Sequence, residues 1–333
     1  MDIYKLLKIN KLIKNHRIKF LGLYLLHFFN KRYLAINLDP IMACNLRCKM
    51  CYFTDKEYLK TLKGNLKEED LNCISNAVFK RALKLQIGCG TEPTLYRNLS
   101  KIVELGKKHK VPYISLTTNA NLLSRSKIEE LLKAGLNEFT ISMHGVRKDT
   151  YEDFMQKGDY HKFRENFNFF EEFKKTYKFK VRLNYTFNKD NFNELKDLFN
   201  YYNGNIIDVL QIRPIQKLGN TQYNNFDLTS IKNEYNSVLE ILKNQCKNHN
   251  IILLAPQDLL QEEITNVSSV LFNYTFFYIS PNSFERSDFN WKKESFEEFS
   301  KRTKWGNKIL KNVLKSKREL ISSSKHLNYD ISI

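Results

Sequence analysis

The stretch that decides the fold runs from residue 33 to residue 51 and reads YLAINLDPIMACNLRCKMC. Its first seven residues, 33–39, are rich in aromatic and aliphatic side chains, which is typical of a buried strand. A loop follows in which three cysteines, Cys44, Cys48 and Cys51, stand within eight residues. We therefore expect a strand that carries a cysteine-rich loop at its carboxyl end.

From this stretch onward, strand and helix patterns alternate as far as residue 213. Such alternation is typical of βα units around a parallel sheet. Strands are predicted over residues 33–39, 83–88, 113–117, 138–142, 179–187 and 209–213, and helices over residues 68–81, 99–108, 126–134, 160–176 and 191–202. Six strands separated by five crossovers predict an α/β fold with a partial (β/α)6 barrel at residues 33–219.

Two further segments flank the predicted barrel. Residues 1–32 form a basic N-terminal segment with one helix predicted over residues 2–30. Residues 220–333 read as a small α+β C-terminal extension. It has helices near 229–247 and 294–302 and apolar strand-like segments at 251–254 and 276–279.

Polar residues repeat at every second position of the predicted strands, which puts them on one face of the sheet. These positions are Asn37, Asp39, Ser115, Thr117, Asn119, Thr140, Ser142, His144, Arg182, Asn184, Thr186, Gln211 and Arg213. If helices cover the opposite, apolar face, the polar side chains line the interior. Closed eight-stranded barrels fill that space mainly with branched aliphatic side chains. A polar interior therefore predicts a wet cavity for a polar ligand.

The three clustered thiols can reach three corners of a cubane iron–sulfur cluster, which needs four ligands. One iron then stays open for a chelating ligand. Zinc is the alternative, but a structural zinc site needs four closed ligands. The fourth would have to come from a residue such as His109 or His144, which are distant in the sequence. The loop favours a cluster.

Together with these cysteines, three further segments resemble the radical S-adenosylmethionine (SAM) superfamily, whose signature CxxxCxxC follows the first barrel strand. Residues 88–93, GCGTEP, stand where that family carries a GGEP-like segment. Residues 118–120, TNA, are similar to its TNG segment, and residues 142–145, SMHG, to its S-x-D-G segment. Thr91 replaces a usual glycine, and His144 stands where an acid is usual. The resemblance covers residues 34–215.

This resemblance implies one 4Fe–4S cluster, held by the three cysteines, and SAM as the chelating ligand. It also implies that one electron from a flavodoxin or ferredoxin cleaves SAM to a 5′-deoxyadenosyl radical, which abstracts hydrogen from the substrate. The predicted SAM contacts are Met50, Tyr52, Gly88, Gly90, Glu92, Thr118, Asn119, Ser142 and Arg182. The sequence identifies no catalytic residue.

Several residues near these motifs have two interpretations. A guanidinium forks onto carboxylates and phosphates, so Arg182 and Arg213 are candidates for binding such a group, with a structural ion pair to Asp39 as the alternative. His144 fits a hydrogen-bonded structural histidine better than an acid–base group. Cys89 is either packed beside the glycines or reactive, whereas Cys73 and Cys246 are assigned no role.

The formal net charge of +18 resides mostly at the two ends of the chain. Residues 1–35 and 301–333 each carry a net charge of +7, so 14 of the 18 charges lie outside the predicted barrel. Nucleic acid is therefore an unexpected partner for the barrel interior. The basic helix at residues 2–30 has two interpretations. The favoured one is a helix packed against the domain with its lysines in solvent, and the alternative is peripheral contact with the inner face of a membrane. Clustered thiols suit a reducing compartment, so we expect a cytoplasmic protein.

The polar interior favours a sugar, a nucleotide sugar or a peptide as substrate. The segments 279–282 and 294–299 are weakly similar to the SPASM-type extensions of peptide-modifying members. However, only Cys246 lies beyond residue 89, so an auxiliary cluster is not expected. Two alternatives stay open: an RNA-modifying radical SAM enzyme, and a non-catalytic iron–sulfur or zinc-binding protein.

Overall fold

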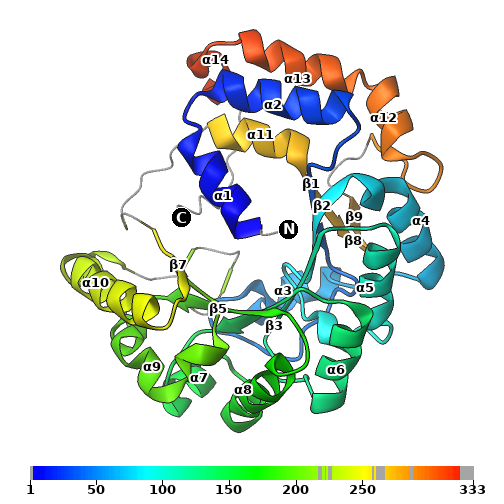
Figure 1. Cartoon of the computed structure of the whole chain (residues 1–333). Helices are drawn as coiled ribbons and strands as arrows, with labels where there is room; N and C mark the ends of the chain where they lie inside the picture. Colours follow the sequence, from blue (N-terminus) through cyan, green and yellow to red (C-terminus); the bar gives the residue numbers. More distant parts are fainter. Residues whose placement is uncertain are drawn as a thin grey trace.

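The computed structural model describes residues 3–216, 220–221, 223, 227–256, 259, 267–284 and 288–322. Figure 1 shows a curved sheet surrounded by helices, and the sheet is open between its two edge strands, β7 and β9. The strand order is β7-β6-β5-β4-β3-β2-β1-β8-β9, and all neighbours are parallel except β8 and β9. The sheet is not closed, which confirms an α/β partial barrel.

The six predicted strands are all present, and the C-terminal region adds strands at both edges of the sheet. The bounds are β1 Leu34–Leu38, β2 Ala82–Ile87, β3 Tyr113–Thr118, β4 Glu138–Met143, β5 Lys180–Phe187, β6 Val209–Pro214, β7 Ile252–Leu254, β8 Phe276–Ser280 and β9 Ser283–Phe284. β7 pairs with β6, and β8 pairs with β1. The segment boundaries at residues 32 and 219 stay predictions.

The helices include the five predicted crossovers and several shorter elements. Their bounds are α1 Ile3–Leu12, α2 His16–Phe28, α3 Lys56–Thr61, α4 Glu68–Val78, α5 Leu99–Lys108, α6 Arg125–Ala134, α7 Lys148–Phe154, α8 Tyr160–Lys174, α9 Leu198–Tyr201, α10 Lys232–Asn248, α11 Val267–Thr275, α12 Phe296–Arg302, α13 Trp305–Leu314 and α14 Lys317–Ser322. The last predicted crossover, at residues 191–202, is mostly a 3-10 helix followed by the short α9.

The crossover helices pack against the apolar face of the sheet, as the strand alternation predicts. Phe139 of β4, for example, lies 5.1 Å from the ring of Phe170 on α8 and 5.8 Å from the ring of Phe179. The opposite face turns inward and carries buried polar side chains such as Asn184 and Gln211. The apolar core therefore surrounds a polar interior.

The prediction of a single helix over residues 2–30 is wrong, because the described part of this segment forms two helices. α1 ends at Leu12, and α2 begins after Asn15, whose side chain accepts a hydrogen bond from the backbone of Arg17 at 2.9 Å. Asparagine is a preferred N-cap residue, so it starts a new helix here instead of continuing the old one. Asp2 lies outside the described residues.

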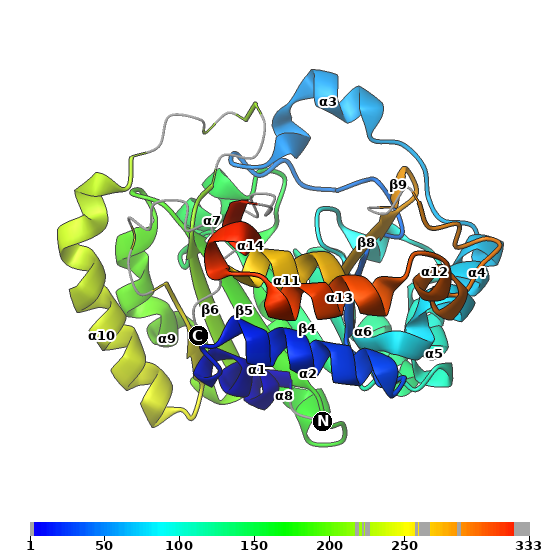
Figure 2. The same cartoon turned by 90° about the horizontal axis from the view of Figure 1, so that it is seen from above.

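The break lets α1 and α2 take different positions. α1 enters the open side of the barrel at the end where the strands begin, and Tyr4 is 2% exposed there. α2 lies beside α13, as Figure 2 shows from above. Among the described residues, no helix is long and apolar enough to cross a bilayer.

Candidate functional site

The cysteine loop follows β1 and lies across the mouth of the barrel, where the parallel strands end. Backbone hydrogen bonds fasten it on two sides. Leu66 donates to Pro40 at 2.8 Å and Met42 donates to Gly64 at 3.0 Å, while Lys49 donates to Phe154 at the end of α7 at 2.9 Å. The protein's own backbone therefore holds the loop at the mouth.

The three thiols of this loop are partly buried and free of disulfides. Burial raises the pKa of Cys44 to about 12 and raises that of Cys51. Burial also raises the pKa of Cys48, and the neighbouring Cys51 and Cys44 add to that rise. Metal coordination reverses this preference, because a thiolate is the form that binds metal.

Within the described residues, no three His, Cys, Asp or Glu side chains converge as the ligands of a single metal ion do. A structural zinc ion needs four closed ligands, whereas a cubane held by three protein thiolates keeps one iron open for a chelating ligand. Cys44 Sγ has two N–H groups close by, from the backbone of Leu46 at 3.4 Å and the side chain of Asn119 at 3.8 Å.

The segment after β2 forms a cradle, residues 88–92, whose glycines allow close backbone approach. Gly88 has φ +81°, which favours glycine. A Cβ on Gly88 would clash with the carbonyl oxygen of Thr117, and a Cβ on Gly90 would clash with the hydroxyl of Tyr52. Tyr52 donates its hydroxyl hydrogen bond to the Gly90 carbonyl. The cradle is thus packed against the cysteine loop.

Asp39, at the end of β1, orients this cradle from below. Its buried carboxylate accepts hydrogen bonds from the backbone N–H groups of Cys89 at 2.7 Å and Gly90 at 3.0 Å. The hydroxyls of Thr91 and Tyr278 donate to it as well, at 3.0 and 2.8 Å. Asp39 therefore positions the cradle, and these four hydrogen-bond donors do not include the arginine of the alternative ion pair. The sequence signal was a carboxylate that directly follows the first strand.

Glu92 links the cradle to the segment after β3. Its buried carboxylate accepts hydrogen bonds from the hydroxyl of Thr118 at 2.7 Å and the backbone of Asn119 at 2.8 Å. It also caps the short turn at Thr94. Burial raises the pKa of Glu92, while these donors oppose the rise. Glu92 therefore joins two of the predicted SAM-binding segments.

The remaining predicted contacts lie around the same mouth. Met50 is buried under the loop against Phe154 and Ile215. Ser142 ends the polar row of β4 and is partly buried. Burial, followed by the positive charge of Arg213, lowers the pKa of His144 to about 3, so its ring is neutral, and Nδ1 has no hydrogen-bond partner in the described chain.

Arg182 and Arg213 lie at different levels along the barrel axis. Arg182 lies near the start of β5 and donates to Gln211 and, at 3.5 Å, to the hydroxyl of Tyr4. With a rise of about 3.3 Å per residue, the five residues from Arg182 to the end of the strand place it roughly 16 Å below the mouth. Arg213 lies near the end of β6 and donates to Thr186 at 3.2 Å. The position of Arg182 favours a structural role, and its SAM contact stays an unsupported prediction.

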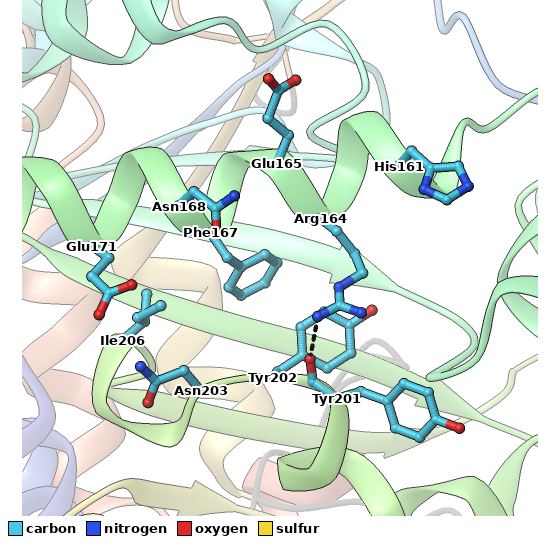
Figure 3. Close-up of a pocket in the computed structure, with 10 residues that line it drawn as sticks. All are labelled: His161, Arg164, Glu165, Phe167, Asn168, Glu171, Tyr201, Tyr202, Asn203 and Ile206. Atoms are coloured by element: carbon cyan, nitrogen blue, oxygen red, sulfur yellow. Dashed lines mark hydrogen bonds between the residues drawn. The ribbon is translucent and has the colours of Figure 1, made fainter.

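A separate hollow lies outside the barrel, on α8, and is drawn in Figure 3. It is lined by His161, Arg164, Glu165, Phe167, Asn168, Glu171, Tyr201, Tyr202, Asn203 and Ile206. Arg164 already donates to the carbonyl of Tyr201 at 2.8 Å and lies 5.5 Å from the Tyr202 ring centre. None of the predicted site residues lines it, so the barrel mouth remains the candidate site.

A partial barrel with a thiol-bearing loop and a glycine cradle at its mouth defines the class of protein. The family model of the radical SAM superfamily matches residues 39–202. The chain therefore carries a radical SAM domain, and that domain belongs to a class of enzymes. Members of this family use a 4Fe–4S cluster and SAM, which confirms the two predicted cofactors for the family.

Relatives with assigned names match part of the chain. A probable GTP 3′,8-cyclase of Methanococcus vannielii is 27% identical over 217 residues, 62% of this chain and 67% of that protein. A probable GTP 3′,8-cyclase of Thermoplasma volcanium is 31% identical over 125 residues, 37% of this chain and 37% of that protein. The matched part thus spans about a third to two thirds of the length of these relatives.

Solved structures share the fold at low sequence identity. Streptococcus suis SuiB bound to S-adenosylmethionine has a TM-score of 0.58 and 18% identity, covering 77% of this chain and 60% of SuiB. A structure of anSMEcpe with bound AdoMet has a TM-score of 0.59 and 17% identity, covering 85% and 84% of the two chains.

Proposed function

We propose that this protein is a radical SAM enzyme that abstracts hydrogen from a polar substrate at the barrel mouth. The observation that carries this proposal is that the three thiols, the glycine cradle and the ends of the polar strand faces meet at one rim. When bound, the cluster would reduce SAM and supply a 5′-deoxyadenosyl radical. The chain's own residues then have to bind, orient and shield the reactants.

The residues of the mouth fit these tasks. Cys44, Cys48 and Cys51 would hold the cluster, and the cradle would accept the methionine part of SAM along its backbone. Gly88 and Gly90 let the cradle pack closely, because a Cβ on Gly88 would meet the Thr117 carbonyl oxygen and a Cβ on Gly90 would meet the Tyr52 hydroxyl. Glu92 and Asp39 would hold the cradle at a fixed distance from the cysteine loop through the hydrogen bonds described above.

The polar interior favours a sugar, a nucleotide sugar or a peptide as substrate. Thr117 Oγ1, Asn184 Oδ1 and His144 Nδ1 are buried without a partner in the described chain. A buried polar atom of this kind costs about 1–3 kcal/mol unless something bonds to it, so a polar ligand would satisfy these groups. Relatives named for a nucleotide substrate, and a SuiB structure with its precursor peptide SuiA, make GTP and peptides reasonable compounds to test.

We also propose a reduced flavodoxin or ferredoxin as electron donor and the cytoplasm as location. Residues 2–30 would make peripheral contact with the inner face of the membrane, because the described part of this segment exposes both apolar and basic side chains. The charges at the chain ends keep an RNA substrate as the second candidate, which requires binding that falls steeply with salt.

The reaction is tested by reconstituting the protein anaerobically with iron and sulfide and adding dithionite and SAM. Nucleotide sugars, GTP, short peptides and RNA are then supplied separately in deuterated form. We expect 5′-deoxyadenosine that carries deuterium from one polar compound. A bound cluster that yields no 5′-deoxyadenosine with any of them favours an electron carrier, and a chain that takes up only zinc favours a binding protein.

A further inference from the structure

The solvent-facing side of α2 is apolar, although a helix on the surface of a soluble barrel normally exposes a polar side. α2 buries Phe20 and Leu23 against the protein. Its opposite side exposes 55%, 44%, 44% and 63% of Ile18, Leu21, Leu25 and Phe28. Their spacing of three, four and three residues aligns them in one stripe along the helix. These four side chains are exposed and do not belong to the buried core of the barrel.

The neighbouring helix α13 continues this apolar surface. α13 buries Trp305 and Ile309 and exposes Leu310 and Leu314, the latter to 81%. α2 and α13 lie side by side and together face the viewer in Figure 2. We call the resulting surface the outer face and define it by Ile18, Leu21, Leu25, Phe28, Leu310 and Leu314. Exposed apolar surface of this kind marks an interaction site.

The charge around the outer face indicates what binds there. Exposed basic residues on or beside the two helices are Lys14, Arg17, Lys304, Lys308, Lys311 and Lys315. Neither helix, each described over its full length, contains an acidic residue, and the exposed Glu319 lies beside α13 on α14. A second copy of this face would bring like charges together. RNA would match the charge but leave the aliphatic side chains unburied.

We propose that the outer face docks the protein on an anionic lipid bilayer. An interfacial helix buries its apolar stripe at the level of the headgroups, while lysines and arginines contact anionic lipids. The inference rests on the peripheral membrane contact proposed above. It assigns that contact to two helices, α2 and α13, instead of to residues 2–30 alone. The surface is shared by α2 and by α13, which is more than 270 residues away along the chain.

Docking on this face leaves the barrel mouth accessible. In Figure 2 the ribbons of α2 and α13 lie at the front of the molecule, while α3, next to the cysteine loop, projects at the edge of the view. The mouth therefore opens along the bilayer and not into it. A substrate at the headgroup level or in the adjacent solution reaches the site while the protein stays bound.

The proposal is tested by co-sedimentation of the full reconstituted chain with vesicles. Phosphatidylcholine vesicles with and without phosphatidylglycerol are compared. We expect binding only when phosphatidylglycerol is present, and weakening as salt rises. Leu25→Glu should weaken this binding by about tenfold or more. Ile241→Glu is the matched control, because Ile241 is 38% exposed on α10 and should leave binding unchanged.

Other results would overturn it. Equal binding to both kinds of vesicle, or a Leu25→Glu variant that binds like the wild type, contradicts docking by the outer face. Binding of RNA that Leu25→Glu abolishes would assign the face to another partner. Release of 5′-deoxyadenosine is measured in parallel without vesicles. Failed docking with intact release refutes this inference and the membrane contact on which it rests but not the proposed reaction, and intact docking without release refutes only the proposed reaction.

Discussion

The base of the barrel, where the parallel strands begin, and the mouth, where they end, both carry polar side chains on the inner face of the sheet. The two ends differ in whether these side chains have hydrogen-bond partners within the protein. At the base, Glu138 is fully buried and accepts hydrogen bonds from Tyr4, Tyr113 and Thr140. Two of these donors come from the barrel and one from α1. The base is therefore closed by the protein itself, with a buried carboxylate as the common acceptor.

At the mouth, the polar groups either hold loops in place or await a partner. Asp39 and Glu92 fasten the cradle, whereas Thr117 Oγ1 and His144 Nδ1 have no partner within the described residues. Unpaired buried polar atoms are costly, so a ligand that forms hydrogen bonds with these two atoms would stabilise the mouth. The base also contains unpaired buried polar atoms. One of them is Arg182 Nε, which has no hydrogen-bond partner among the described residues. The comparison makes binding a property of the mouth and stability a property of the base.

The largest effect on stability and on SAM affinity is expected from substitution of Asp39, which holds the cradle at the mouth. Asp39→Ala leaves two partly buried backbone N–H groups and two hydroxyls without this acceptor, which costs about 2–3 kcal/mol of stability. We also expect SAM to bind at least about tenfold more weakly, measured by calorimetry on the reconstituted protein. Tyr278→Phe removes only one of the four hydrogen bonds and should cost about 1 kcal/mol. Unchanged SAM affinity in Asp39→Ala would show that the cradle is held by other contacts.

A second substitution tests the base alone. Glu138→Gln removes the charge that three hydroxyls share and should cost about 1.5–3 kcal/mol in the free energy of unfolding. SAM affinity and release of 5′-deoxyadenosine should stay unchanged, because Glu138 lies at the opposite end from the cradle. Denaturant unfolding and SAM calorimetry measure the two quantities. A variant that keeps its stability but loses SAM binding would remove the distinction between the two ends.

The base should also respond to acid through His27. Burial, followed by the positive charge of Arg81, lowers the pKa of His27 to about 4. Between about pH 6.5 and 4 the unfolded chain therefore takes up a proton that the folded chain does not, so stability falls as the pH falls. After a discount for partial exposure, we expect the wild type to lose roughly 1 kcal/mol more than His27→Gln between pH 7 and pH 5. Equal losses in denaturant unfolding at the two pH values would contradict this.

The smallest effect is expected in the midpoint potential of the cluster at the mouth. Asn119 donates toward Cys44 Sγ at 3.8 Å and to Asn45 at 2.9 Å. A hydrogen bond to a cluster thiolate stabilises the reduced state, so Asn119→Ala should make the midpoint potential more negative. A redox titration followed by electron paramagnetic resonance measures this shift. Asn45→Ala keeps the N–H group near the sulfur and serves as the control. An equal shift in both variants would assign the effect to loop packing.

Local patterns were sufficient to predict the strands, the cysteine loop and the order of the motifs. Strand alternation depends on neighbouring residues, and the cysteine spacing lies within eight positions, so neither needs knowledge of distant contacts. The same alternation correctly put Arg182 on the inner face. The place of Arg182 near the start of the predicted strand also indicated a level far from the mouth, but the prediction of a SAM contact did not take that level into account.

What the sequence could not supply were the contacts between distant segments. Tyr278 reaches Asp39 across 239 positions, and Tyr4 reaches Glu138 across 134. Neither pair has a local pattern, because β8 and α1 are far in the sequence from the strands that they contact. The break after α1 was signalled by Asn15, a preferred helix cap, but a continuous apolar periodicity on both sides concealed it.

The central claim is that Cys44, Cys48 and Cys51 hold a cluster that acts on SAM at the mouth. The most direct measurement compares Cys48→Ala with Cys73→Ala, a partly buried cysteine on α4 away from the loop. After anaerobic reconstitution, iron content and 5′-deoxyadenosine release are measured for both. The account predicts that Cys73→Ala keeps both and that Cys48→Ala loses the release and most of the iron. Release of 5′-deoxyadenosine by Cys48→Ala at the wild-type rate would contradict it.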